Sequence, residues 1–321
     1  LPVHHRQPKE GLASPMAAVG LSLLAALGFA SSAILSRQGM QTIFPLPGVM
    51  VSLLFSFLLA SAMVLIFAFS DISGIPQVAV LWILALGVMN FLGGRSQNFL
   101  SVNLIGASRA SLFVSSQAPF AAIFAIAFTG ESIHPVVALG TVAVVGGLLF
   151  ASGDSIREGW RTDKSFLIGY LMALGAGAAY GATNVMAKHT LGIYDSPLMM
   201  TAFSMLIGLV VLSPLVGASA VHSGIIRPRS PEDRGILQSL LSFKYVALAG
   251  VASGVAVISW YLAVQRADVV VISPIVSSSP LVTLFLAHLF LTKLERVTRR
   301  LVFGAVLTVA GVGFVVVGSQ L

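Results

Sequence analysis

One arginine, Arg95, lies inside a long apolar run, within the sequence NFLGGRSQNF at residues 90–99. A permanent cation is costly at membrane depth, where charged side chains usually face a cavity or a partner. The run is expected to end about seven residues away, roughly 10 Å along a helix, which is far for a side chain that reaches toward water. A guanidinium also offers a two-pronged donor to a carboxylate or phosphate. We therefore predict that Arg95 binds the anionic group of a small substrate in a cavity.

Other polar side chains share helical faces, because they recur at spacings of three or four residues. Asn98 lies one turn from Arg95, and Tyr180 and Asn184 lie one turn apart in a later run. Such groups can position the rest of a metabolite, although serines in membrane helices also hold helices together. For Trp260 the core, the membrane interface and a cavity wall all stay open. The substrate-binding candidates are Arg95, Asn98, Ser115, Tyr180, Asn184, Trp260, Tyr261 and Ser277.

Two prolines and one histidine complete the candidate set. Pro119 and Pro280 each lie inside an apolar run, where a proline removes a helix hydrogen bond and frees a carbonyl group. We predict that both act as hinges during transport. His288 is the candidate for proton coupling, with a hydrogen-bonded packing role as its alternative.

Acidic and thiol side chains are missing where other chemistries need them. No Asp or Glu falls inside an expected membrane span, whereas an embedded carboxylate is the usual device for binding cationic drugs. The chain has no cysteine, which excludes disulfides and thiolate metal sites. Ser253 and His288 lack the surrounding motif of a protease. We expect no cofactor, no metal and no catalytic residue, and we keep cationic drug efflux and an intramembrane enzyme as alternatives.

The composition is that of a membrane protein. Hydrophobic residues make up 57% of the 321 and charged residues 9%, against about 45–50% and about 25% in soluble domains. The net charge of +7 lies on no polar domain, so we expect no nucleic-acid partner. Ten runs are long enough to cross a bilayer. They cover approximately residues 16–37, 47–69, 78–102, 107–128, 134–152, 166–188, 197–217, 244–264, 269–291 and 298–318.

The two halves of the chain repeat each other. The motif of Glu131, Gly140 and Gly147 returns with the same spacing as Glu295, Gly304 and Gly311. Each half holds five spans, and an odd number of crossings makes the second half enter from the opposite face. The sequence therefore predicts an all-α membrane protein of ten helices in two inverted five-helix repeats. The predicted parts are a tail at 1–15, repeats at 16–153 and 166–321, a linker at 154–165 and a polar surface loop at 218–243.

Positive charges gather on one side of this topology. Thirteen of the 18 Lys and Arg residues fall in loops on one face, which we call the basic face. Cytoplasmic loops carry an excess of Lys and Arg, so the basic face is expected in the cytoplasm and both termini outside. The predicted location is the cell membrane, with many crossings.

The stretch IGASRASLFVSSQAPFAAIFAIAFTGE at residues 105–131, with a less regular copy that ends at Glu295, resembles the EamA-type repeat of the drug/metabolite transporter superfamily. The second half departs from the pattern, with LTKLE where the repeat has Gly-Glu. The resemblance implies ten helices, a central substrate cavity, and export or exchange of amino acids and related metabolites. It also implies cytoplasmic termini, opposite to the orientation that the charges predict.

These observations together predict a secondary transporter, not an enzyme. It would export or exchange small anionic or zwitterionic metabolites, such as amino acids, across the cytoplasmic membrane by alternating access. A sugar-phosphate or nucleotide-type exchanger is the alternative with the same anion chemistry. The expected partners are a small-molecule metabolite and the lipid bilayer; the oligomeric state is open, and a monomer is compatible with the pattern.

Overall fold

The helices of the first half follow one another through short connections. The computed structural model describes residues 15–129, 135–158, 164–223, 236–264, 266, 275–276, 278–292, 294 and 297–318. The first half contains α1 (Pro15–Gly39), α2 (Pro45–Phe67), η1 (Phe69–Gly74), α3 (Gln77–Gly87), η2 (Val88–Arg95), α4 (Ser96–Ile105), α5 (Ala107–Val114), α6 (Gln117–Thr129) and α7 (Pro135–Glu158). Prolines at the first helical positions start α2, where a missing N–H costs nothing.

The second half has the same succession of long helices. It contains α8 (Lys164–Ile193), α9 (Pro197–Ser223), α10 (Ile236–Val264), α12 (Ser279–Phe290) and α13 (Arg299–Gly318). Seven helical stretches among the described residues are long and apolar enough to cross a membrane, and Pro135–Ala151 and Ser279–Phe290 are shorter apolar helices. The all-α membrane fold predicted from the sequence is confirmed. The ninth predicted span, 269–291, is described only at 275–276 and from 278 onward.

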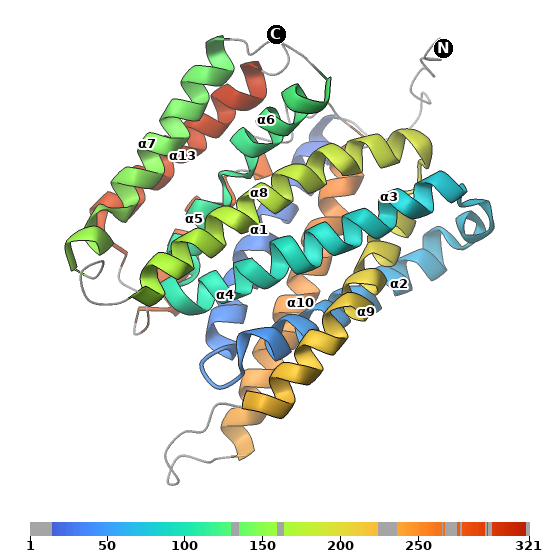
Figure 1. The fold of residues 1–321 in the computed structure, drawn as a ribbon, viewed down its shortest axis with the longest axis horizontal. Coiled ribbons are helices and arrows are strands. Elements are labelled where there is room, and N and C mark those ends of the chain that lie inside the picture. Colours follow the sequence, from blue (N-terminus) through green and yellow to red (C-terminus); the bar gives the residue numbers. More distant parts are fainter. Residues whose placement is uncertain are drawn as a thin grey trace.

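The packing of the helices follows an inverted pseudo-symmetry. Helices α7 and α13, the last of each half, lie side by side (Figure 1), and α2 packs on its counterpart α9. The first helix of each half packs on the third span of the other, so that α1 contacts α10 while α8 contacts α4. Likewise α1 contacts α12, as α8 contacts α6. The described part of α1 begins, and that of α13 ends, at the same end of the bundle (Figure 1).

Two spans of the first half depart from regular α-helix. The third span runs without a break through α3, η2 and α4, but residues 88–95 form a π-helical segment with wider turns. Such segments are rare in proteins, and many of those that occur lie at functional sites. The span ends at Gly106, whose φ of 90° suits a residue without a Cβ. The fourth span is broken at Ser115 and Ser116, between α5 and α6.

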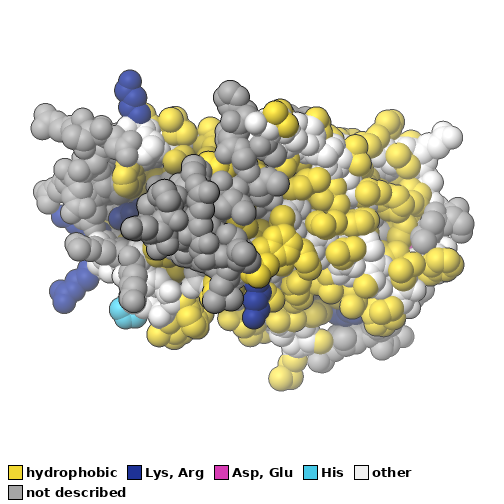
Figure 2. All heavy atoms as spheres, turned by 90° about the horizontal axis from the view of Figure 1, so that it is seen from below, with side chains coloured by type: hydrophobic (Ala, Val, Ile, Leu, Met, Phe, Trp, Pro, Cys, Tyr) yellow, Lys and Arg dark blue, Asp and Glu magenta, His cyan; other side chains and the backbone are white. Residues whose placement is uncertain are grey.

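The outer surface of the bundle is apolar. Large side chains such as Phe67, Leu81, Val142 and Phe303 are more than half exposed. Figure 2 shows hydrophobic side chains across much of the described surface on one side of the molecule. Exposed apolar area of this extent suits hydrocarbon rather than water. Polar residues that are buried inside the bundle therefore stand out as candidates for function.

Candidate functional site

Arg95 lies at the end of the π-helical segment and is buried, with 6% of its surface exposed. One terminal nitrogen, Nη1, donates a hydrogen bond of 3.0 Å to Ser253 Oγ. The other, Nη2, donates to Ser52 Oγ at 2.7 Å and to Ser56 Oγ at 3.2 Å. The Phe99 ring lies beside the guanidinium, with its centroid 5.8 Å from Cζ. The Nε donor has no partner among the described residues.

This cluster joins the two halves of the molecule. Ser52 and Ser56 come from α2 and Ser253 from α10. Helix α10 can approach α2 closely because Gly250 has no Cβ; a Cβ at this position would collide with the Ser52 carbonyl. Ser253 lies one turn further along α10. The Ser56 hydroxyl donates a hydrogen bond of 2.7 Å to the Gly250 carbonyl oxygen. The lone pairs of the Ser56 oxygen therefore face Arg95. Arg95 is thus held by uncharged hydroxyl oxygens from both repeats.

Tyr180 and Asn98 extend the polar cluster toward α8. The Tyr180 side chain is hydrogen-bonded to Asn98 and is an electrostatic neighbour of Arg95. Its ring covers Gly94, where an added Cβ would overlap the ring. Asn184 lies one turn further along α8 and is half-buried. The structure therefore brings together Arg95, Asn98 and Tyr180, with Asn184 on the same helix as Tyr180, and their contact with substrate stays a prediction.

Ser115 and Pro119 flank the break in the fourth span. The Ser115 hydroxyl donates to the carbonyl of Ser111 in its own helix, at 3.2 Å. Pro119 is the third residue of α6, a position where a proline breaks no helical hydrogen bond. Pro280 occupies the corresponding place in the second half, within the first turn of α12. Both prolines thus follow an interruption of a span, and their role as hinges stays a prediction.

Trp260 and Tyr261 lie on α10 in apolar surroundings. Their rings contact each other with centroids 4.8 Å apart. Tyr261 is buried among Ile83, Leu86 and other apolar side chains, and Trp260 packs at the edge of the same cluster. The two residues lie two turns from Ser253 along α10, so they are not part of the Arg95 cluster. Their contact with substrate stays a prediction.

The remaining candidates lie elsewhere. Ser277, Glu131 and Glu295 fall outside the described residues. His288 is exposed in the last turn of α12, and its part in proton coupling stays a prediction. The described residues contain no group of three His, Cys, Asp or Glu side chains that could hold a metal ion.

The hydroxyls that bind Arg95 carry little signal in the sequence. Ser52 and Ser56 were not singled out, and Ser253 was considered only as a nucleophile. The one available signal is that Ser52 and Ser56 are four residues apart and so share a face of α2. That pattern is common in membrane helices and does not name a partner.

Two cavities lie near the basic face. One, of about 430 Å³, is bordered by the ends of α1, α10 and α12; the other, of about 270 Å³, by residues of α2, α4, α8 and α9. Ser96 and Gln97 border the smaller cavity, directly after Arg95, but Arg95 itself borders neither. In this conformation the guanidinium is therefore buried and lies outside both of these cavities.

A hydrogen-bonded contact joins the two halves at the opposite face. Ser196 Oγ donates to the Asp71 carboxylate at 2.7 Å, and the Tyr194 hydroxyl donates to the Asp71 backbone carbonyl at 2.8 Å. Burial raises the pKa of Tyr194 above its ordinary value, which already lies above neutral pH, so the hydroxyl is protonated and can donate this hydrogen bond. Asp71 belongs to η1 of the first half, and the other two residues connect α8 with α9.

Comparison with known proteins identifies the family. A model of the EamA-like transporter family matches residues 16–153 and again 167–317. Purine permease 2 of Arabidopsis thaliana is 33% identical over 100 residues, which make up 30% of this chain and 26% of that protein. The alignment thus spans about a quarter of this relative's length.

A solved crystal structure of another protein shares the fold. It superimposes with a TM-score of 0.64 over 94% of this chain and 96% of the other, at 16% sequence identity. The two matches of the family model cover nearly the whole chain, one match for each five-helix half. This chain therefore belongs to the EamA-like transporter family, as a multi-pass membrane protein.

Proposed function

We propose that this protein exports or exchanges small anionic or zwitterionic metabolites, such as amino acids, by alternating access. One observation carries the proposal: Arg95 is buried in the bundle with neutral hydroxyls as its hydrogen-bond partners among the described residues. A buried cation without a nearby carboxylate gains most from an incoming anion. A carboxylate or phosphate would replace serine hydroxyls on Nη1 and Nη2 and occupy the open Nε donor.

Access to Arg95 would come with movement of the two halves. The hydrogen bond from Arg95 to Ser253 crosses between the repeats, so a rocking movement that separates α10 from α2 would expose the guanidinium. The breaks before Pro119 and Pro280 are the proposed flexible points of this movement. We place the basic face in the cytoplasm and both termini outside, on the distribution of Lys and Arg.

Sugar phosphates and nucleotides share the anionic group that Arg95 would bind, and they stay within the same proposal. A purine is the second candidate substrate, favoured by the local similarity to a protein described as a purine permease. The aromatic pair of Trp260 and Tyr261 would then offer a face for a planar ring. Cationic drugs are disfavoured because the expected spans carry no acidic side chain.

The test is efflux from proteoliposomes loaded with amino acids, organic acids, sugar phosphates and purines. We expect wild-type protein to release anionic or zwitterionic species, and Arg95→Ala to lose that release. Arg95→Lys should retain part of the rate, because it keeps the charge but not the two-pronged geometry.

Arg109→Ala serves as the matched control, since Arg109 lies at the start of α5, away from the Arg95 cluster. This variant should transport like wild type. Equal efflux by wild type and Arg95→Ala would reject the role of Arg95. Release of purines alone, unaffected by Arg95→Ala, would favour the second candidate.

A further inference from the structure

The two halves are hydrogen-bonded to each other at the face opposite the basic face. Asp71, in η1 of the first half, accepts a hydrogen bond of 2.7 Å from Ser196 at its carboxylate and one of 2.8 Å from the Tyr194 hydroxyl at its backbone carbonyl. Both donors lie between α8 and α9 of the second half, and only 8% of Tyr194 and 5% of Ser196 is exposed. These short, buried bonds hold η1 against the start of α9.

The position of Asp71 favours this contact without making it permanent. Ser196 directly precedes Pro197, the first residue of α9, so the Asp71 carboxylate lies near a helix start, where the helix dipole stabilises a negative charge. The hydrogen-bond partners of the carboxylate among the described residues are the neutral hydroxyls of Ser70 and Ser196. Water can replace neutral hydroxyls at a modest cost when the face opens, so the contact is reversible.

Helix α3 continues the contact between the halves below Asp71. The ring of Trp82, in α3, lies against that of His189, near the end of α8, with centroids 4.7 Å apart. Deeper in the bundle, α3 approaches α9 so closely that a Cβ at Gly87 would lie 2.9 Å from the Ser204 carbonyl oxygen. Opening this face therefore requires α3 to separate from α8 and α9, and the hydrogen bonds of Asp71 oppose that separation.

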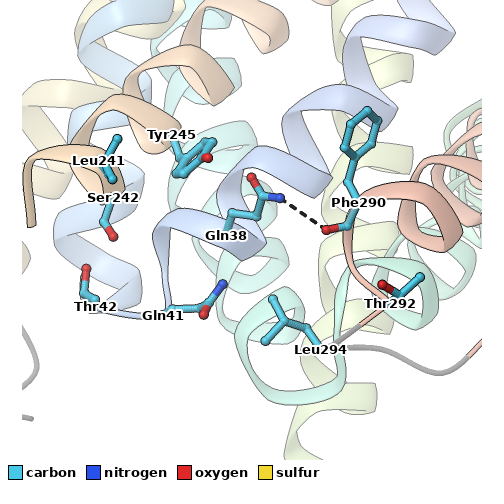
Figure 3. A pocket seen from close by; sticks show the side chains of 9 residues that line it. All are labelled: Gln38, Gln41, Thr42, Leu241, Ser242, Tyr245, Phe290, Thr292 and Leu294. Carbon is cyan, nitrogen blue, oxygen red and sulfur yellow. Dashed lines mark hydrogen bonds between the residues drawn. The ribbon is translucent and has the colours of Figure 1, made fainter. Parts of the chain in front are cut away.

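The corresponding contact that the structure describes at the basic face is weaker. Gln38, near the end of α1, donates to the Phe290 carbonyl oxygen of α12 at 3.4 Å (Figure 3), which is long for such a bond. Both residues border the cavity of about 430 Å³. Between the described parts of the two halves, short buried hydrogen bonds thus lie at one face and a long exposed one lies beside a cavity at the other.

We propose that Asp71, Tyr194 and Ser196 form a latch, which keeps the face opposite the basic face closed and opens when the protein passes to its other access state. The inference rests on the alternating access of the proposed function but not on its substrate. Opening breaks the two hydrogen bonds to Asp71 and exposes the interface of α3 with α9, where Ser204 lies. The strength of the latch sets the fraction of molecules that are open at this face.

The test follows the reaction of one buried cysteine with N-ethylmaleimide in the purified full-length protein in detergent. The native chain has no cysteine, and Ser204 is 9% exposed, so Ser204→Cys should react mainly in molecules whose latch is open. Adding Ser196→Ala or Tyr194→Phe should raise the reaction rate about five- to tenfold, the effect of one lost hydrogen bond on the opening equilibrium. Ser213→Ala is the matched control and should leave the rate unchanged, because the Ser213 hydroxyl bonds within α9.

A second reporter separates a latch from a general loosening of the fold. Ser96 borders the smaller cavity near the basic face, and alternating access does not open that face further when the opposite face opens. Ser196→Ala should therefore not speed the reaction of Ser96→Cys. An unchanged rate at Ser204→Cys, or a similar acceleration at Ser96→Cys, would overturn the latch. Neither readout uses a substrate, so a failed latch leaves the proposal for Arg95 standing, and absence of anion transport leaves the latch.

Discussion

Arg95 is held by three serine hydroxyls, and this choice of partners has an energetic cost. Removing a cation from water costs several kcal/mol even after relaxation, and neutral hydroxyls return only part of that. A carboxylate in place of Ser52 would supply a counter-charge, but it would also occupy the donors that the proposed substrate needs. The hydroxyls therefore solvate the guanidinium while leaving its charge uncompensated.

The first prediction follows from that cost. Arg95→Met replaces the cation by an apolar side chain of similar length, and we expect unchanged or higher stability together with loss of anion transport. Replacing a whole buried ion pair by apolar residues is often neutral or stabilising, by about 1–4 kcal/mol, and the Arg95 guanidinium has no carboxylate among its hydrogen-bond partners to offset its desolvation. The measurement is the melting temperature in detergent beside the efflux rate. A large fall in melting temperature would show instead that Arg95 holds the fold together.

The polar residues that are rare in apolar runs could be identified from the sequence, whereas the serines that bind Arg95 could not. Arg95 was found because a cation is rare in an apolar run, and Asn98 and Tyr180 because helical spacing aligns such residues. Ser52 and Ser56 were missed because a serine that binds a neighbouring backbone carbonyl and one that binds a cation look alike in sequence. Whether such a serine can reach a cation depends on the close approach of α10 to α2 at Gly250, and that approach is seen only in the folded structure.

At the scale of helices, α7 and α13 are joined through glycines that the two repeats share. A Cβ at Gly147 would lie 2.7 Å from the Gly304 carbonyl oxygen, and one at Gly140 would lie 2.7 Å from that of Gly311. The first glycine of each motif thus faces the second glycine of the other, as antiparallel helices require. The glycines that reveal the repeat in the sequence therefore also pack the last helices of the two halves against each other.

The second prediction compares neighbouring glycines of α7. Gly147→Ala should destabilise the protein by about 1–3 kcal/mol, because the new methyl group forces the two helix backbones apart. Gly146→Ala should have little effect, since a Cβ there meets only Leu307, at 4.0 Å. Thermal unfolding in detergent measures both. Equal melting temperatures for the two variants would contradict the close contact of α7 with α13.

At the scale of the whole molecule, contacts between the repeats differ at the two faces. Both described cavities adjoin the basic face, whereas at the opposite face Asp71 is bound by Tyr194 and Ser196. Span lengths and repeats could be predicted from hydropathy and spacing, because a bilayer and an inverted repeat constrain the chain from end to end. The position of the two described cavities could not be predicted, because it depends on how the helices pack in three dimensions.

The third prediction concerns orientation, and the absence of cysteine makes it simple to test. A single cysteine at Lys244, at the basic end of α10, should react with a membrane-impermeant maleimide only after cells are permeabilised. A cysteine at Gln77, at the other end of the bundle, should react in intact cells. The reverse pattern would place the basic face outside and both termini in the cytoplasm.

The uncompensated charge of Arg95 has a further consequence in an energised cell. The residue lies ten positions before the end of α4 at Ile105, about 15 Å by helix rise and so well within the bilayer. An elementary charge that crosses the whole transmembrane voltage changes in energy by about 2.3 kcal/mol per 100 mV. An anion bound as proposed would cancel this charge, so the membrane voltage would then act differently on the empty protein and on the loaded one.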